Sequence, residues 1–77
     1  MKRHEATRRA RQLHSGAFCK EAVDSPRRER YQVLVSLRGE TYLVASGRNW
    51  LEALEGWFNW HEENGGRLHA EEKEAVH

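Results

Sequence analysis

The side chains of this chain that could do chemistry are its histidines, its one cysteine, its arginines and its glutamates, and their spacing indicates binding rather than catalysis. No pair of histidines forms a His-Glu-x-x-His pattern, and Cys19 has no second cysteine at a metal-ligand spacing. No serine or cysteine nucleophile stands in a supporting motif, and the scattered glycines form no phosphate-binding loop. We therefore expect no catalytic residue, no metal and no cofactor. The histidines are His4, His14, His61, His69 and His77.

Basic residues concentrate in the first part of the chain. Residues 1–30 hold nine Lys/Arg and four Asp/Glu, a balance of +5, whereas residues 31–77 hold four and eight, a balance of −4. Such a split could serve an acidic partner, a basic partner, or the mutual neutralisation of the two halves. Arginines that contact phosphates would make the first segment a nucleic-acid-binding element, and the alternative is a solvated helix face. These candidate nucleic-acid-binding residues are Arg3, Arg8, Arg9 and Arg11.

The three tryptophans lie between residues 49 and 66, and Trp60 falls off the main apolar arc of the helix expected there. Together with Ala53 and Gly56 it forms a second stripe, in which one large ring stands beside two small residues. Because tryptophan is enriched at the energetic centres of protein interfaces, we predict a partner-binding surface anchored by Trp60. The alternative is that an N-terminal alanine stripe packs into this notch and covers the ring. The predicted surface comprises Trp60, Gly56 and a rim suited to a basic partner, formed by Glu52, Glu55, Glu62 and Glu63.

The helix that carries these residues, predicted over 49–63, has clear signals at both ends. Asn49 is a favourable N-cap with Glu52 three residues later, and Asn64-Gly65-Gly66 is a stop signal. At about 100° per residue, one set of side chains falls within an arc of about 120° and is expected to pack on a sheet. These side chains are Trp50, Leu51, Leu54, Trp57, Phe58 and His61.

The alternation of residues 30–46 predicts a β-hairpin that supplies this sheet. Its two-residue loop is either Gly39-Glu40 or Arg38-Gly39, and the second choice opposes Val35 to Tyr42 and Val33 to Val44. Both registers place the same side chains on the core face: Tyr31, Val33, Val35, Leu37, Tyr42 and Val44.

Two strands alone do not form a stable sheet, so another segment must complete it. The candidates are residues 17–23, which suit either an edge strand or a helix, residues 66–69, and a second copy of the chain. A homodimer joined at the hairpin edge is therefore an open alternative.

The predicted fold class is α+β, in one small domain over residues 1–77. A small antiparallel sheet, with the hairpin 30–46 and an optional third strand, packs on the helix 49–63 to form a core over 30–64. Residues 1–15 form a basic helix or arm with a narrow stripe at Ala6, Ala10 and Leu13, and residues 70–77 are expected to be a solvated tail.

The expected location is the cytoplasm. One cysteine excludes a disulfide within the chain, and no apolar run follows the charged N-terminal residues. No stretch approaches the ~20 apolar residues of a membrane span, so no contact with a membrane is expected.

Residues 31–61 resemble small phage-encoded accessory proteins, including anti-CRISPR proteins of the type I systems. The resemblance is carried by a hairpin, a short polar link and a helix with the run Leu54-Glu55-Gly56-Trp57-Phe58. It implies a protein that is not an enzyme and that binds a host or effector complex, blocking the DNA path, a guide-binding surface or nuclease recruitment. Acidic surfaces in such proteins occupy nucleic-acid channels lined by lysine and arginine.

The same hairpin and helix also resemble the small DNA-binding domains of phage integrases, which bind DNA through a three-stranded sheet rich in Arg and Lys. Here the outer face of the hairpin offers chiefly Arg38. Taken together, these patterns predict a protein-binding module, with a small nucleic-acid-binding protein as the alternative.

Overall fold

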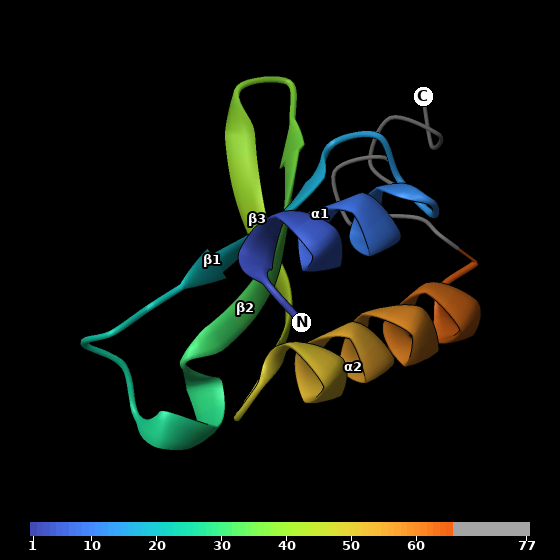
Figure 1. Cartoon of the computed structure of the whole chain (residues 1–77). Helices are drawn as coiled ribbons and strands as arrows, with labels where there is room; N and C mark the ends of the chain where they lie inside the picture. Colours follow the sequence, from blue (N-terminus) through green and yellow to red (C-terminus); the bar gives the residue numbers. More distant parts are fainter. Residues whose placement is uncertain (66–77) are drawn as a thin grey trace.

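Three antiparallel strands and two α-helices make up residues 1–65, the part of the chain that the computed structural model describes (Figure 1). The predicted α+β class is confirmed. The predicted tail 70–77 and the candidate strand 66–69 lie outside the described residues. In chain order the elements are α1 (Arg3–Arg11), β1 (Ala17–Glu21), the 3-10 helix η1 (Arg27–Glu29), β2 (Tyr31–Leu37), β3 (Glu40–Gly47) and α2 (Trp50–Glu63).

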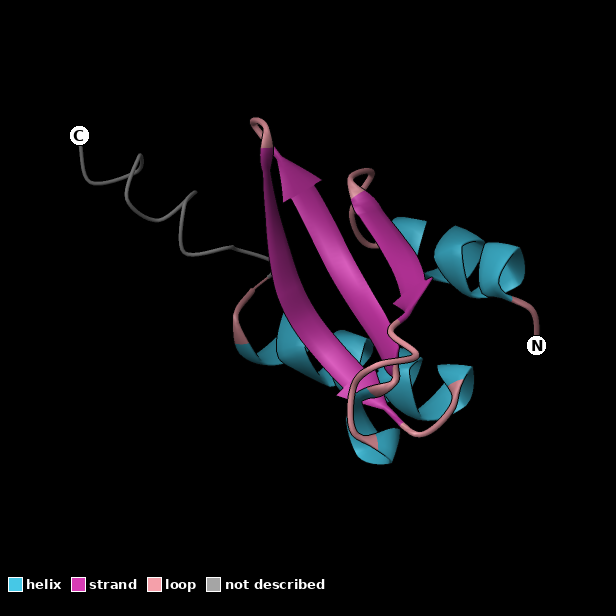
Figure 2. Cartoon of the chain, turned by 90° about the vertical axis from the view of Figure 1, so that its left-hand side faces the viewer, coloured by secondary structure: helices cyan, strands magenta, loops and turns pink. Residues whose placement is uncertain are grey.

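The strand β1 completes the sheet, which has the order β1-β2-β3 and is antiparallel throughout. Residues 17–21 are therefore an edge strand. Of the two alternatives for residues 1–15, a helix or an arm, the structure has a helix over residues 3–11, docked through the fully buried Ala6 and Ala10. Both helices pack on one side of the sheet, α1 along β1 and α2 chiefly on β3 (Figure 1 and Figure 2).

The hairpin turn is Arg38-Gly39, with φ of 53° and 82°, values typical of the two-residue turns that suit twisted strands. Val35 pairs with Tyr42, as one of the two predicted registers requires. Further along, Val33 pairs with Ala45 rather than with Val44, because β3 has a bulge there. The bulge turns Ala45 toward α2, an outcome that strict alternation did not predict.

Trp57 lies at the centre of the core, where its side chain is fully buried. Its indole Nε1 donates a hydrogen bond to the carbonyl oxygen of Ala10 at 3.1 Å, which joins the two helices. The small side chains of α1 let the helices approach closely. The buried core residues are Ala6, Ala10, Ala17, Cys19, Val33, Val35, Trp50, Ala53, Leu54 and Trp57.

The predicted burial is wrong for two residues of α2. Leu51 is 65% exposed and Phe58 is 39% exposed, although both were expected to face the sheet. Ala53 is fully buried in their place, and a Cβ added at Gly56 would lie 3.4 Å from the Cβ of Ala45. The physical reason is that only small side chains fit where α2 crosses the bulged part of β3.

The outer edge of β1 is covered by side chains of α1. The Cys19 N–H donates to Thr7 Oγ1 at 3.1 Å, and Arg11 Nε donates to the Ala17 carbonyl oxygen at 3.0 Å. These bonds satisfy backbone groups that would otherwise invite another strand. A homodimer through the sheet would therefore have to pair along β3, the other edge.

Candidate functional site

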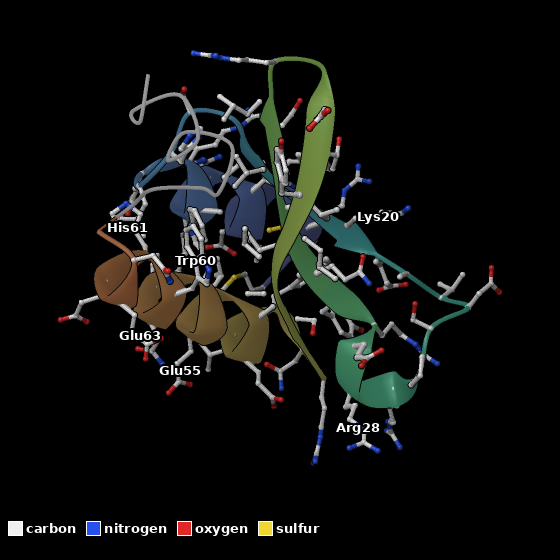
Figure 3. All side chains as sticks on the ribbon, turned by 180° about the vertical axis from the view of Figure 1, so that it is seen from behind. Lys20, Arg28, Glu55, Trp60, His61 and Glu63 are labelled. Atoms are coloured by element: carbon white, nitrogen blue, oxygen red, sulfur yellow. The ribbon has the colours of Figure 1, made fainter. Side chains whose placement is uncertain are left out.

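The acidic residues predicted for a partner surface are all exposed on α2, where the Asn49 cap starts the helix. Asn49 Oδ1 accepts from the Glu52 N–H at 2.8 Å, as predicted. In Figure 3, Glu55 and Glu63 point away from the sheet. Glu52 and Glu62 are likewise exposed, so this side of α2 carries four carboxylates.

Trp60 does not join these glutamates. Its ring is only partly exposed, stacks on Trp57 with centroids 5.6 Å apart, and packs against the core. Figure 3 shows it on the inner side of α2, and Gly56 likewise lies near β3. The structure thus separates the predicted anchor and its notch from the predicted acidic rim.

The residues that the sequence analysis missed are Leu51 and Phe58, which lie two helical turns apart on the outer side of α2. They line a shallow groove of about 400 Å³, and the buried Leu54 lies between them. Glu55 and Asn59 border this groove on α2, and Arg9 borders it from α1. We call Leu51, Glu55 and Phe58 the α2 strip. Helical periodicity placed Leu51 and Phe58 on the apolar arc of α2. No local feature of the sequence indicated that the sheet leaves this part of the arc exposed to solvent.

Three of the four predicted arginines lie together on another surface. Arg3, Arg8 and Arg11 line a groove of about 510 Å³ between α1 and β1, which we call the α1–β1 groove. Arg9 lies apart from it, forming an ion pair with Glu5 at 3.7 Å and bordering the α2 strip. The remaining groove residues are His4, Thr7, Phe18 and Cys19. Burial raises the pKa of the Cys19 thiol, while its hydrogen bond with Thr7 acts in the opposite direction.

A third surface gathers arginines near the start of α2. Arg27 and Arg28 of η1 and Arg48 line a separate open groove with Pro26 and Asn49. Figure 3 shows Arg28 projecting outward from η1. These arginines therefore form a basic surface that is separate from the α1–β1 groove.

Other kinds of site find no support in the part of the chain that is described. Within residues 1–65, no group of three or more His, Cys, Asp or Glu side chains could hold a metal ion. None of the helices in that range is long and apolar enough to cross a membrane.

Comparisons with known proteins add no assignment. The chain matches no protein family, no curated protein and no solved structure.

The placement of Gly56 yields a prediction about stability. Gly56→Ala is expected to raise the free energy of unfolding by about 0.5–1 kcal/mol, because glycine within a helix is unfavourable. The new methyl group would meet its nearest neighbour, the Cβ of Ala45, at 3.4 Å. Urea unfolding followed by circular dichroism measures the change. A lower midpoint than that of the wild type would contradict the described spacing between α2 and β3.

Proposed function

We propose that this protein is a non-enzymatic protein-binding module that acts in the cytoplasm through the α2 strip. The observation that carries the proposal is the exposure of Leu51 and Phe58 on one helix face beside a shallow groove. Large apolar side chains arranged around a groove and bordered by polar residues are typical of helix-mediated protein recognition.

The charges around the strip define the chemistry of the partner. Glu52, Glu55, Glu62 and Glu63 are exposed on α2, and among the described residues Arg9 is the one cation that borders the groove. An acidic border favours a partner whose apolar contact surface is surrounded by lysine and arginine. Nucleic-acid-processing protein complexes present such surfaces. We therefore propose as the partner a larger host or effector complex of this kind, in keeping with the resemblance to anti-CRISPR proteins.

This proposal keeps the predicted acidic residues and replaces the predicted anchor. Trp60 supports α2 from the inside through its stack on Trp57. The exposed apolar contacts are Leu51 and Phe58, and the flanking glutamates contribute orientation and association rate more than affinity.

The test compares a double variant of the strip with a matched variant elsewhere. Leu51→Ala with Phe58→Ala is expected to weaken partner capture about tenfold or more, since truncated interface centres typically cost at least about 2 kcal/mol. Leu43→Ala removes another exposed leucine, 56% exposed on β3, and is expected to leave capture unchanged. The measurement is quantitative pull-down from nuclease-treated lysate of the host, with circular dichroism to check that each variant is folded. Equal capture by the folded double variant and the wild type would exclude the α2 strip as the contact.

The inhibitor part of the proposal has its own assay. In a bacterium with an active type I CRISPR system, expression of the wild-type chain is expected to raise the plating efficiency of a targeted phage, and the double variant is expected not to. Plating that stays low with the wild-type chain would argue against inhibition of that system, while the pull-down would still report on protein binding.

A further inference from the structure

The α1–β1 groove is cationic, and its charge comes from one side of a docked helix. Arg3, His4, Thr7, Arg8 and Arg11 recur at the spacing of a single helix face, and within residues 1–65 no carboxylate lines this groove. The nearby carboxylate of Glu5 is on another face of α1, where it pairs with Arg9. Neither Arg3 nor Arg8 has an ion-pair partner within residues 1–65. The groove therefore presents positive charge that the described fold leaves uncompensated.

One of these arginines is held in place before any ligand binds. Arg11 Nε donates to the carbonyl oxygen of Ala17 at 3.0 Å, which fixes the guanidinium against the start of β1. This bond uses Nε and leaves the terminal NH₂ groups to donate to a ligand. A fixed guanidinium loses less conformational entropy on binding a phosphate than a fully solvated one.

An aromatic ring lies in the same groove. Phe18 is half-buried on β1 and is paired across the sheet with Leu34, which in turn pairs with Leu43. Phe18 and Leu34 each lie between two buried residues of their strands, so by alternation they face the opposite side of the sheet from the core. The two helices leave that side uncovered within residues 1–65 (Figure 2). Lys20, two residues after Phe18 on β1, is exposed and adds a further cation on the same strand (Figure 3).

We propose that the α1–β1 groove binds single-stranded nucleic acid, with the arginines on phosphates and Phe18 stacking on a base. Cations that follow a backbone, combined with an aromatic ring, are the features by which proteins bind single strands without sequence readout. The Phe18 ring can stack only on a base whose face is free. Unpaired bases of a single strand offer such a face, whereas the bases of a duplex are already stacked on one another. This site is separate from the α2 strip, so either can fail without the other.

The binding assay uses fluorescence anisotropy with a fluorescein-labelled oligothymidylate of about 15 nucleotides, a length that covers the usual site sizes. With three arginines on phosphates, the slope of log affinity against log salt is expected to be about −2. Affinity should then fall about 20-fold between about 50 and 200 mM salt. A slope near zero would overturn the proposal.

Matched variants locate the site. Arg3→Gln with Arg8→Gln is expected to reduce the magnitude of the slope to about 0.7, because one phosphate contact would remain. Arg27→Gln with Arg28→Gln removes the same charge from the separate groove at η1 and is expected to leave the slope near −2. An equal loss in both double variants would indicate attraction by net charge alone and would overturn the assignment to this groove.

The aromatic contact is tested by Phe18→Leu, which keeps apolar bulk and removes the ring. Affinity is expected to fall about tenfold with an unchanged salt slope, since stacking does not release counterions. Unchanged affinity would exclude the stacking role. Tighter binding of a matched duplex, or equal binding of an oligoglutamate, would exclude a site for single strands.

Discussion

Replacing Trp57 with alanine is expected to lower the free energy of unfolding by about 3–5 kcal/mol, the range for large aromatic residues truncated in a core. Trp57 is fully buried, donates its indole N–H to the Ala10 carbonyl oxygen and supports the stacked ring of Trp60. A chain of 77 residues has a total stability of about 4–12 kcal/mol. The variant should therefore lose between about a quarter and all of the stability of the fold.

The measurement is urea unfolding followed by circular dichroism, with two tryptophan variants for comparison. Trp57→Phe keeps a buried ring and loses the indole hydrogen bond, and we expect it to cost about 1–2 kcal/mol. Its cost stays moderate because the Ala10 carbonyl oxygen still accepts from the Leu13 N–H at 3.2 Å. Trp60→Phe changes a partly exposed ring, so we expect it to lower the free energy of unfolding by less than Trp57→Phe does. A Trp57→Ala variant as stable as Trp60→Phe would contradict the central position of Trp57.

Cys19 offers a second readout of the same unfolding. Its side chain is 5% exposed, and burial raises its pKa, so the folded protein holds little reactive thiolate. Reaction with a thiol reagent should therefore be slow in the wild type and faster in Trp57→Ala, because lower stability exposes the thiol more often. Equal rates in the two proteins would show that the core around β1 remains closed.

Replacing Gly47 with alanine is expected to lower the free energy of unfolding by about 1–3 kcal/mol, the typical cost of overpacking a close contact. A Cβ at this position would lie 2.8 Å from the backbone nitrogen of Ala53 and 2.8 Å from the Cβ of Glu52. Both atoms belong to the first turns of α2, so the added methyl group cannot be accommodated by rotating a flexible side chain. Either β3 or the start of α2 must shift.

Gly56→Ala is the matched control, because it adds the same methyl group to the same interface between α2 and β3. The two variants should move the urea midpoint in opposite directions, with Gly47→Ala lower and Gly56→Ala higher than the wild type. A wild-type midpoint for Gly47→Ala would contradict the close approach at residue 47. Because the start of α2 carries Leu51, a shift there is also expected to weaken partner capture by the α2 strip.

Much of the local structure was predictable from neighbouring residues. Asn49 caps α2 through its own side chain, as expected, and the hairpin turn is Arg38-Gly39, one of the two predicted turns. The α+β class follows from one helical pattern and one alternating pattern. Such features depend on interactions within a few residues, which a single sequence displays directly.

The candidate sites depended on contacts that are distant in sequence. The bulge at Val44 places Ala45 against α2, beside Gly56. In this orientation of α2, the side chains of Leu51 and Phe58 are exposed. Helical periodicity indicates that an apolar arc exists, but the fit between α2 and β3 decides which part of the arc is buried.

The same distinction holds for the basic residues. The sequence showed four arginines in one segment, and the docking of α1 on β1 separated Arg9 from the other three and brought Phe18 to them. Residues 17–23 were ambiguous from the sequence alone, and residues 17–21 of this segment form a strand because β2 supplies hydrogen-bond partners. Composition and local pattern determined the elements and their ends, whereas side-chain packing between elements decided which residues form a surface together.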